Sequence, residues 1–215
     1  MAIARLSGVR GRALAVYDAA MRTTHLLYLH GFRSSPQSSK ARMLASRVAR
    51  DYPLVTWWCP QLPPSPRAAM ALVMQGIATW PRAGLAVAGS SLGGFYATWL
   101  AEQMGCKAVL LNPAVDPARD LVGYIGEQNA WHDPQERFVF EPEFVEELRA
   151  LQSGGPHQPQ NYFAVIAKGD EVLDWREMQA RYPGAAVRLL EGSDHALSDF
   201  DAHIEAVLHF LDLAR

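Results

Sequence analysis

The stretch with the clearest capacity for chemistry is residues 89–93, which read Gly-Ser-Ser-Leu-Gly. An apolar run, residues 85–88, precedes it, and a helix-like apolar segment, residues 95–101, follows it. Gly-x-Ser-x-Gly between a strand and a helix is typical of a nucleophile elbow, a strained turn that exposes the central serine and diverts its neighbour. The pattern predicts that Ser91, rather than Ser90, is a nucleophile. An ordinary glycine-rich connection between a strand and a helix can have the same sequence pattern. Residues elsewhere in the chain must therefore show whether this turn is a nucleophile elbow.

A serine hydroxyl at neutral pH needs a base to take its proton and an acid to orient that base. The chain offers both in the order Ser91, Asp170, His195. Asp170 follows a predicted strand and Gly169, and His195 closes the loop after the next predicted strand. We therefore predict that His195 is the general base and acid and that Asp170 orients its ring. Four other histidines either precede Ser91 or lie in the predicted terminal helix: His25, His30, His203 and His209.

The acid has alternatives close to it in the sequence. Glu171 and Asp174 lie near enough to Asp170 to take its place. Asp194 adjoins His195, but an aspartate in such a turn more often bonds its own loop backbone. Asp170 is preferred because it comes directly after the strand, where the crevice of a parallel sheet lies.

Acyl transfer also needs amide donors aimed at the developing oxyanion. One usually follows the nucleophile and the other lies in the loop after an early strand. These backbone amides would belong to Leu92 and Phe32. His30 and Gly31 form the sharp exit from the first predicted strand that turns the Phe32 amide toward the crevice. We interpret the His30 side chain as shaping this loop rather than entering the chemistry.

The predicted elements bring these residues to one edge of a sheet. Apolar runs predict strands at residues 26–29, 54–58, 85–88, 108–111, 162–166 and 186–190. Helical patterns occupy residues 35–50, 67–80, 95–101, 174–182 and 200–211. This alternation predicts a mostly parallel sheet with helices on both faces and a ligand crevice at the carboxyl ends of the strands. Together with the order serine, acid, histidine, it predicts an α/β-hydrolase fold.

Two segments fall outside the alternation. Residues 1–23 are predicted to be an N-terminal extension that need not be ordered, and residues 24–215 a single domain. Within that domain, residues 116–160 are rich in aromatic residues and carry one predicted helix, at about residues 143–151. Two interpretations of this lid-like insertion are open. It is a lid or acyl-pocket wall, or a surface loop whose aromatic residues pack on the core.

Composition limits the other possibilities. A formal net charge of -2 gives no electrostatic case for nucleic acid or an anionic membrane as partner. Cys59 and Cys106 are the only cysteines, which excludes a disulfide framework or a thiolate metal cluster and suits a reducing cytoplasm. No apolar run approaches the roughly 20 residues of a membrane-spanning helix. We expect a cytoplasmic protein that acts on a small molecule.

Several motifs from about residue 24 to the end together resemble those of the YqiA-like esterases. They are Leu-Tyr-Leu-His-Gly-Phe (27–32), Ser-Ser-Pro (34–36), Pro-Gln-Leu-Pro-Pro (60–64), Gly-Ser-Ser-Leu-Gly-Gly (89–94), Tyr-Ala-Thr-Trp-Leu (96–100), Asn-Pro-Ala-Val (112–115), Gly-Asp-Glu-Val-Leu-Asp (169–174) and Gly-Ser-Asp-His-Ala (192–196). The resemblance implies a small α/β-hydrolase that cleaves simple acyl esters and fatty acyl-CoA thioesters without metal or cofactor. It implies a triad of Ser91, Asp170 and His195. The segment before Thr24 departs from the family's usual start.

Two other functions fit the same residues. An acyltransferase would use the same triad and pass the acyl group to an alcohol or amine instead of water. A non-catalytic protein would keep the fold and hold an apolar ligand in the crevice, because a fold does not determine a function.

Overall fold

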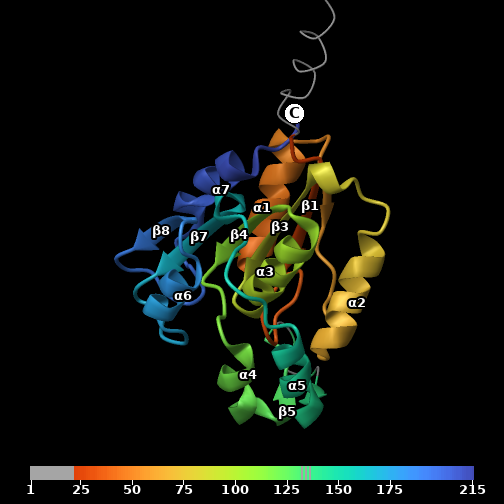
Figure 1. The fold of residues 1–215 in the computed structure, drawn as a ribbon, viewed down its shortest axis with the longest axis vertical. Coiled ribbons are helices and arrows are strands. Elements are labelled where there is room, and N and C mark those ends of the chain that lie inside the picture. The colour runs from red at the N-terminus through yellow and green to blue at the C-terminus, as the bar shows by residue number, and fades with distance from the viewer. Residues whose placement is uncertain (1–21, 132, 134, 136) are drawn as a thin grey trace, which may run out of the picture.

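The computed structural model describes residues 22–131, 133, 135 and 137–215. Its centre is a six-stranded parallel sheet in the order β2-β1-β3-β4-β7-β8 (Figure 1). The strands are β1 (His25–Leu29), β2 (Thr56–Trp58), β3 (Leu85–Ser90), β4 (Lys107–Leu111), β7 (Tyr162–Ala167) and β8 (Ala186–Leu190). The predicted parallel sheet is confirmed.

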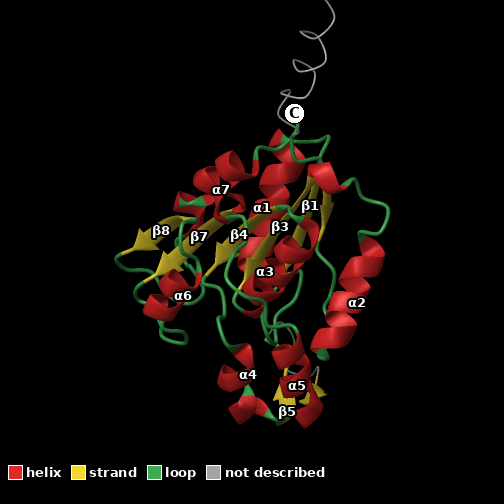
Figure 2. Cartoon of the chain, viewed as in Figure 1, coloured by secondary structure: helices red, strands yellow, loops and turns green. Residues whose placement is uncertain are grey.

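Helices cover both faces of the sheet, as predicted (Figure 2). The helices α1 (Ser39–Asp51) and α7 (Ile204–Leu211) pack on one face, and α2 (Pro66–Gly76), α3 (Leu92–Met104) and α6 (Trp175–Arg181) pack on the other. In β1, Leu26 and Tyr28 face the first group of helices, whereas Leu27 and Leu29 face the second. Successive residues of a strand point to opposite faces, so one continuous apolar strand fills two cores.

The first two helices differ from the prediction at their ends. Ser35 does not cap α1, since its Oγ accepts a hydrogen bond from the Gln37 amide at 3.1 Å in a turn before the helix. The start of α2 is capped by Ser65, whose Oγ accepts from the Ala68 amide at 3.1 Å. This helix ends at Gly76, where a Cβ atom would lie 2.0 Å from the Trp58 ring.

The predicted insertion lies between β4 and β7 and holds more regular structure than expected. It contains α4 (Pro117–Asp120), an antiparallel hairpin of β5 (Gly126–Asn129) and β6 (Arg137–Phe140), and the predicted helix as α5 (Pro142–Ala150). Short 3-10 helices are η1 (Arg82–Gly84), η2 (Val122–Tyr124), η3 (Pro159–Asn161) and η4 (Phe200–Ala202). In the described part of the chain, no helix is both long and apolar enough to cross a membrane.

Aromatic side chains of the insertion pack around one residue of the loop that follows β1. The rings of Tyr124, Phe138 and Phe140 meet the Phe32 ring edge-on, with centroids 5.5, 5.9 and 5.3 Å away. Edge-to-face pairs at such distances stabilise beyond their burial alone. The insertion is therefore packed against the loop that carries the predicted Phe32 amide.

Residues 1–21 of the predicted N-terminal extension lie outside the described residues. Thr23 pairs with the other end of the chain. Its amide donates to the Asp212 carbonyl at 2.9 Å, and its carbonyl accepts from the Ala214 amide at 2.8 Å. The buried Thr23 hydroxyl also donates to the Leu211 carbonyl at 2.6 Å.

The insertion is joined to α2 by Glu147, a buried carboxylate of α5. It accepts hydrogen bonds from the Ser65 hydroxyl at 2.6 Å, the Arg67 amide at 3.1 Å and the Arg67 guanidinium at 2.6 Å. Burial alone would raise the pKa of Glu147, but these hydrogen bonds and the Arg67 charge lower it below its usual range. The ionised carboxylate therefore stabilises the fold.

We expect Glu147→Gln to lower the free energy of unfolding by about 2 kcal/mol, because it removes hydrogen bonds to a charged group. The pKa of Glu147 is lower in the folded than in the unfolded protein, where it is about 4.3. The stabilisation is therefore complete above about pH 4.3 and is lost as the pH falls through the pKa of the folded protein. Urea unfolding should therefore show a difference from wild type that shrinks in acid. The control is Glu146→Gln, whose exposed carboxylate pairs with Arg149. A difference that is constant with pH contradicts this account.

Candidate active site

The predicted nucleophile elbow lies where β3 turns into α3. Ser91 has φ 55° and ψ −121°, a conformation that non-glycine residues rarely adopt. A Cβ atom at Gly89 would lie 2.0 Å from the Gly93 carbonyl oxygen, and one at Gly93 would lie 1.9 Å from the Leu29 carbonyl oxygen. The two glycines of the motif are thus required by close backbone contacts. Ser90 is buried, whereas Ser91 is half-buried.

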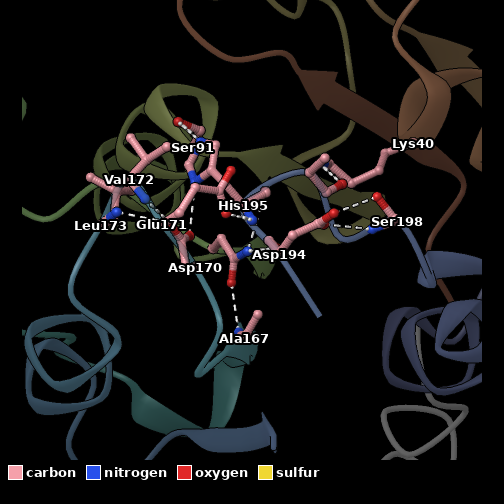
Figure 3. A network of polar contacts seen from close by, with 12 residues as sticks. Lys40, Ser91, Ala167, Asp170, Glu171, Val172, Leu173, Asp194, His195 and Ser198 are labelled. Atoms are coloured by element: carbon pink, nitrogen blue, oxygen red, sulfur yellow. Dashed lines mark hydrogen bonds and ion pairs between the residues drawn. The ribbon is translucent and has the colours of Figure 1, made fainter. Parts of the chain in front are cut away.

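The three residues of the predicted triad lie in hydrogen-bond contact. Figure 3 shows Ser91, His195 and Asp170 in a row, although they come from separate parts of the chain. Ser91 Oγ is 3.1 Å from His195 Nε2, and His195 Nδ1 is 2.7 Å from Asp170 Oδ2. This is the contact order in which a base can take the serine proton while an acid orients the base.

The surroundings of Asp170 fit an ionised carboxylate. Its side chain has no exposed surface, and its Oδ1 accepts the amides of Val172 and Leu173, both at 2.8 Å. Its Oδ2 is left for His195. The carboxylate can only accept from the ring, so the fitting tautomer carries the proton on Nδ1 and leaves Nε2 to accept the Ser91 hydroxyl. The imidazole is 22% exposed, which leaves it open to substrate.

The alternative acids have other partners. Glu171 Oε2 accepts the backbone amide of His195 at 3.0 Å, whereas the hydrogen bonds of the imidazole go to Asp170 and Ser91. Asp174 caps α6, accepting the Arg176 amide at 2.9 Å. Asp194 accepts the Ser198 amide at 2.9 Å within its own loop, as an ordinary turn aspartate does.

His30 ties the loop after β1 to the proline-rich loop that follows β2. Its buried ring accepts the Leu62 amide on Nε2 at 3.1 Å, and its Nδ1 lies 3.0 Å from the Gly31 carbonyl. Gly31 itself lies against the nucleophile, since a Cβ atom there would be 3.2 Å from Ser91 Cβ. The imidazole thus holds loops in place beside the site.

The predicted oxyanion amides belong to Phe32 and Leu92, on the two loops that meet at Ser91. Among the described residues, neither amide donates to a backbone or side-chain acceptor. A cavity of about 450 Å³ is lined by both residues. Its apolar lining includes Leu62, Pro63, Leu72, Tyr96 and Phe138, and its polar lining includes Arg33, Ser34 and Gln61. This is a typical size for a small-molecule site.

The sequence did not indicate that the β5–β6 hairpin holds the residue after Phe32. Arg33 has φ 59°, its carbonyl accepts the Trp131 amide at 2.7 Å, and its Nε donates to the Asn129 carbonyl at 2.6 Å. The guanidinium also lies 4.3 Å from the centroid of the Trp131 ring. Together with Phe138 in the cavity wall, these contacts place the insertion beside the candidate site.

Lys40 of α1 is a charged group near the triad. Its ammonium donates to the Ala196 carbonyl, next to His195. Burial lowers the pKa of Lys40 to about 8, and the carboxylates of Asp194 and Asp170 act in the opposite direction.

A larger cavity, of about 550 Å³, lies between α2, α3 and α5 and is not lined by Phe32 or Leu92. The triad residues do not line either cavity. Its lining is mainly apolar, with Met70, Met74 and Trp99. Within the described ranges, no group of three or more His, Cys, Asp or Glu residues is placed to hold a metal ion. Cys59 is half-buried and Cys106 buried, and burial raises the pKa of each thiol to about 12.

The profile of the Uncharacterised protein family (UPF0227) matches residues 25–212. Among solved structures, the chain is similar to one of LipS and LipT, two metagenome-derived lipolytic enzymes, with a TM-score of 0.64 and 18% identity over 89% of this chain and 95% of that one. The structure of Est1E from Butyrivibrio proteoclasticus is similar with a TM-score of 0.64 and 14% identity, over 91% of this chain and 89% of that one. The structure of mouse alpha/beta hydrolase domain-containing protein 10 is similar with a TM-score of 0.62 and 14% identity, over 88% of this chain and 91% of that one. Identities this low concern the fold alone, and they confirm the predicted α/β-hydrolase fold.

Proposed function

The chain belongs to the Uncharacterised protein family (UPF0227), which is the YqiA family, and on this premise we propose that it is a serine hydrolase of carboxylic esters or acyl-CoA thioesters. The observation that carries the proposal is the hydrogen-bonded chain from Ser91 through His195 to Asp170 at a strained elbow. One similar structure is named as a lipolytic enzyme and another as an esterase domain from a Rhodothermus marinus protein, and both support the proposal as analogies of fold.

In the proposed reaction, Ser91 Oγ attacks the carbonyl carbon of the substrate while His195 Nε2 takes the hydroxyl proton. The carbonyl oxygen becomes an oxyanion, which the amides of Phe32 and Leu92 stabilise. Collapse of this intermediate breaks the bond to the alcohol or thiol, which leaves with the proton from His195. The acyl group then remains on Ser91.

Water completes the cycle on the same groups. His195 takes a proton from water, the resulting hydroxide attacks the acyl carbon, and a second oxyanion forms in the same hole. Collapse releases the carboxylic acid and returns the proton to Ser91 Oγ. Asp170 stays ionised throughout and stabilises the imidazolium through Nδ1.

The cavity beside the two amides supports an acyl group as the part of the substrate that is recognised. Its wall is formed by Leu62 and Pro63 of the proline-rich loop, Leu72 of α2, Tyr96 of α3 and Phe138 of the hairpin. Apolar lining favours a hydrocarbon chain, because burying each methylene contributes about 0.8 kcal/mol.

The proposal is tested with matched 4-nitrophenyl esters and acyl-CoA thioesters that differ only in acyl length. Released acid and released alcohol or thiol are quantified with and without added acceptor alcohols and amines, using Ser91→Ala as the control. We expect equal amounts of acid and leaving group. Acylated acceptor in place of acid identifies a transferase. Ligand binding with no product from any substrate identifies a binding protein and overturns the proposal.

Leu72 offers a direct test of the acyl cavity. We expect Leu72→Trp to lower kcat/KM for an octanoyl ester by about tenfold relative to an acetyl ester, because one or two methylenes in an apolar pocket are worth this factor. The matched control is Leu54→Trp, at an exposed leucine that does not line the cavity. Equal losses on both esters in Leu72→Trp contradict this placement of the acyl chain.

A further inference from the structure

The segment that leaves β4 supplies none of the predicted catalytic groups, yet it contacts the loops that carry all three triad residues. The Ser91 amide donates to the Leu111 carbonyl at 3.0 Å, and the Ala114 amide donates to the Ser91 carbonyl at 3.0 Å. Pro113 packs against Gly94, where a Cβ atom would lie 2.7 Å from Pro113 Cβ. The elbow is therefore held on both sides by the exit from β4.

Asn112 extends this contact to the other two loops. Its side chain is fully buried, and its Nδ2 donates to the carbonyls of Asp194 at 2.9 Å and His195 at 3.2 Å. Its Oδ1 accepts the Ala167 amide at 2.8 Å, at the start of the turn that leads to Asp170. Figure 3 shows the Ala167 end of this bridge below the triad. One side chain thus joins the acid loop to the base loop.

The bridge requires an asparagine by its chemistry. The side chain must donate twice at one end and accept at the other, which an amide does and a carboxylate or alkyl group does not. The His195 carbonyl and the Ala167 amide bond to this side chain, and so does the Asp194 carbonyl, which also accepts the Leu197 amide at 3.0 Å. Leaving buried polar groups unpaired is costly. Asn112 also has φ 42°, in the left-handed region that asparagine tolerates better than most residues.

We propose that Asn112 is a positioning residue for the proposed hydrolysis. Its amide fixes the spacing between the Asp170 turn and the His195 loop, so that the imidazole lies between the carboxylate and Ser91 Oγ. Without the bridge the two loops separate, and His195 loses alignment with one of its partners. This inference rests on the proposed function, and its test includes a readout that does not need turnover.

The test uses Asn112→Gly, which keeps the left-handed backbone and removes the amide, and Asn112→Asp, which keeps the shape and removes the donors. The matched control is Thr23→Val, which removes a buried hydrogen bond to the Leu211 carbonyl at the opposite end of the sheet strands. For each variant we would measure thermal unfolding, kcat and KM for one 4-nitrophenyl ester, and the downfield proton resonance of His195 Nδ1–H.

We expect both Asn112 variants to fold. Their kcat should fall by about 100-fold, because displacing a catalytic group by about 1 Å has an effect of this size. Their KM should change by less than about threefold. The Nδ1–H resonance should weaken or disappear. Thr23→Val should be destabilised yet keep kcat and the resonance.

Three results would overturn the proposal. The first is a folded Asn112 variant that keeps both kcat and the resonance. The second is an equal loss of kcat in Thr23→Val, which would make the effect one of general stability. The third is failure of both Asn112 variants to fold, which would make Asn112 a residue of the fold rather than of the site. If the wild type hydrolyses no ester but the resonance depends on Asn112, the positioning role stands and the proposed function fails.

Discussion

Ser91→Ala and His195→Ala are each expected to lower kcat by about a millionfold, and the double variant should be no slower than either single variant. The reason lies in the contacts of the site. His195 Nε2 lies 3.1 Å from Ser91 Oγ, and in the proposed reaction the hydroxyl attacks only when the imidazole takes its proton. Asp170→Asn should be milder, with a loss of about ten-thousandfold, because it disturbs the tautomer and leaves the attacking pair in place.

Single-turnover and steady-state rates on one activated ester measure these losses. Ser90→Ala is the matched control, because this neighbouring serine is buried in β3 and takes no part in the proposed reaction. The Ser90→Ala enzyme should retain activity within about tenfold of wild type. The triad variants should keep only the low residual rate that substrate binding and the oxyanion amides sustain. Additive losses, with the double variant far slower than either single variant, contradict a triad that acts as a unit.

Gly93→Ala is expected to lower the free energy of unfolding by at least about 4 kcal/mol. Helix propensity alone argues for the opposite sign, since alanine in a helix is favoured over glycine by about 1 kcal/mol. Steric overlap decides the outcome. The new Cβ atom would lie 1.9 Å from the Leu29 carbonyl oxygen and 2.7 Å from that of His30, and backbone atoms inside a sheet cannot move aside.

The measurement is denaturant unfolding with circular dichroism, together with the yield of soluble protein. The control is Gly123→Ala, where a Cβ atom would have no heavy atom within 4 Å, so stability should change little. A Gly93→Ala protein with an unchanged unfolding midpoint would show that the elbow is looser than these distances imply.

Local sequence patterns were enough to place the predicted triad residues near one another. Ser91, Asp170 and His195 follow β3, β7 and β8, and the carboxyl ends of parallel strands meet at one edge. Strands such as β3 and β7, buried along their whole length, produce the apolar runs from which they were predicted.

The supporting contacts could not be predicted, because they join residues distant in sequence. Arg33 and Asn129 are 96 residues apart, and Asn112 and His195 are 83 apart. The β5–β6 hairpin also has weak local signals, since β5 reads Gly-Glu-Gln-Asn, and Gly, Glu and Asn are depleted in strands. Its packing against Phe32 is a tertiary effect that no short window of sequence contains.

The contacts of the insertion are compatible with both interpretations that the sequence left open, and the role of acyl-pocket wall stays a prediction. Its aromatic residues pack on Phe32, as those of a surface loop on a core would. Phe138 also lines the cavity beside the predicted oxyanion amides, as an acyl-pocket wall would. The substrate range of the proposed hydrolase is therefore expected to depend on this hairpin as well as on α2.

The central claim is that Ser91 is an activated nucleophile, and a fluorophosphonate tests it most directly. The probe phosphonylates a serine Oγ with loss of fluoride, and intact mass with peptide mapping locates the label. We predict stoichiometric labelling at Ser91, none in Ser91→Ala, and strongly slowed labelling in His195→Ala. Folded wild-type protein that stays unlabelled while a control serine hydrolase reacts, or that is labelled at another residue, would contradict the account.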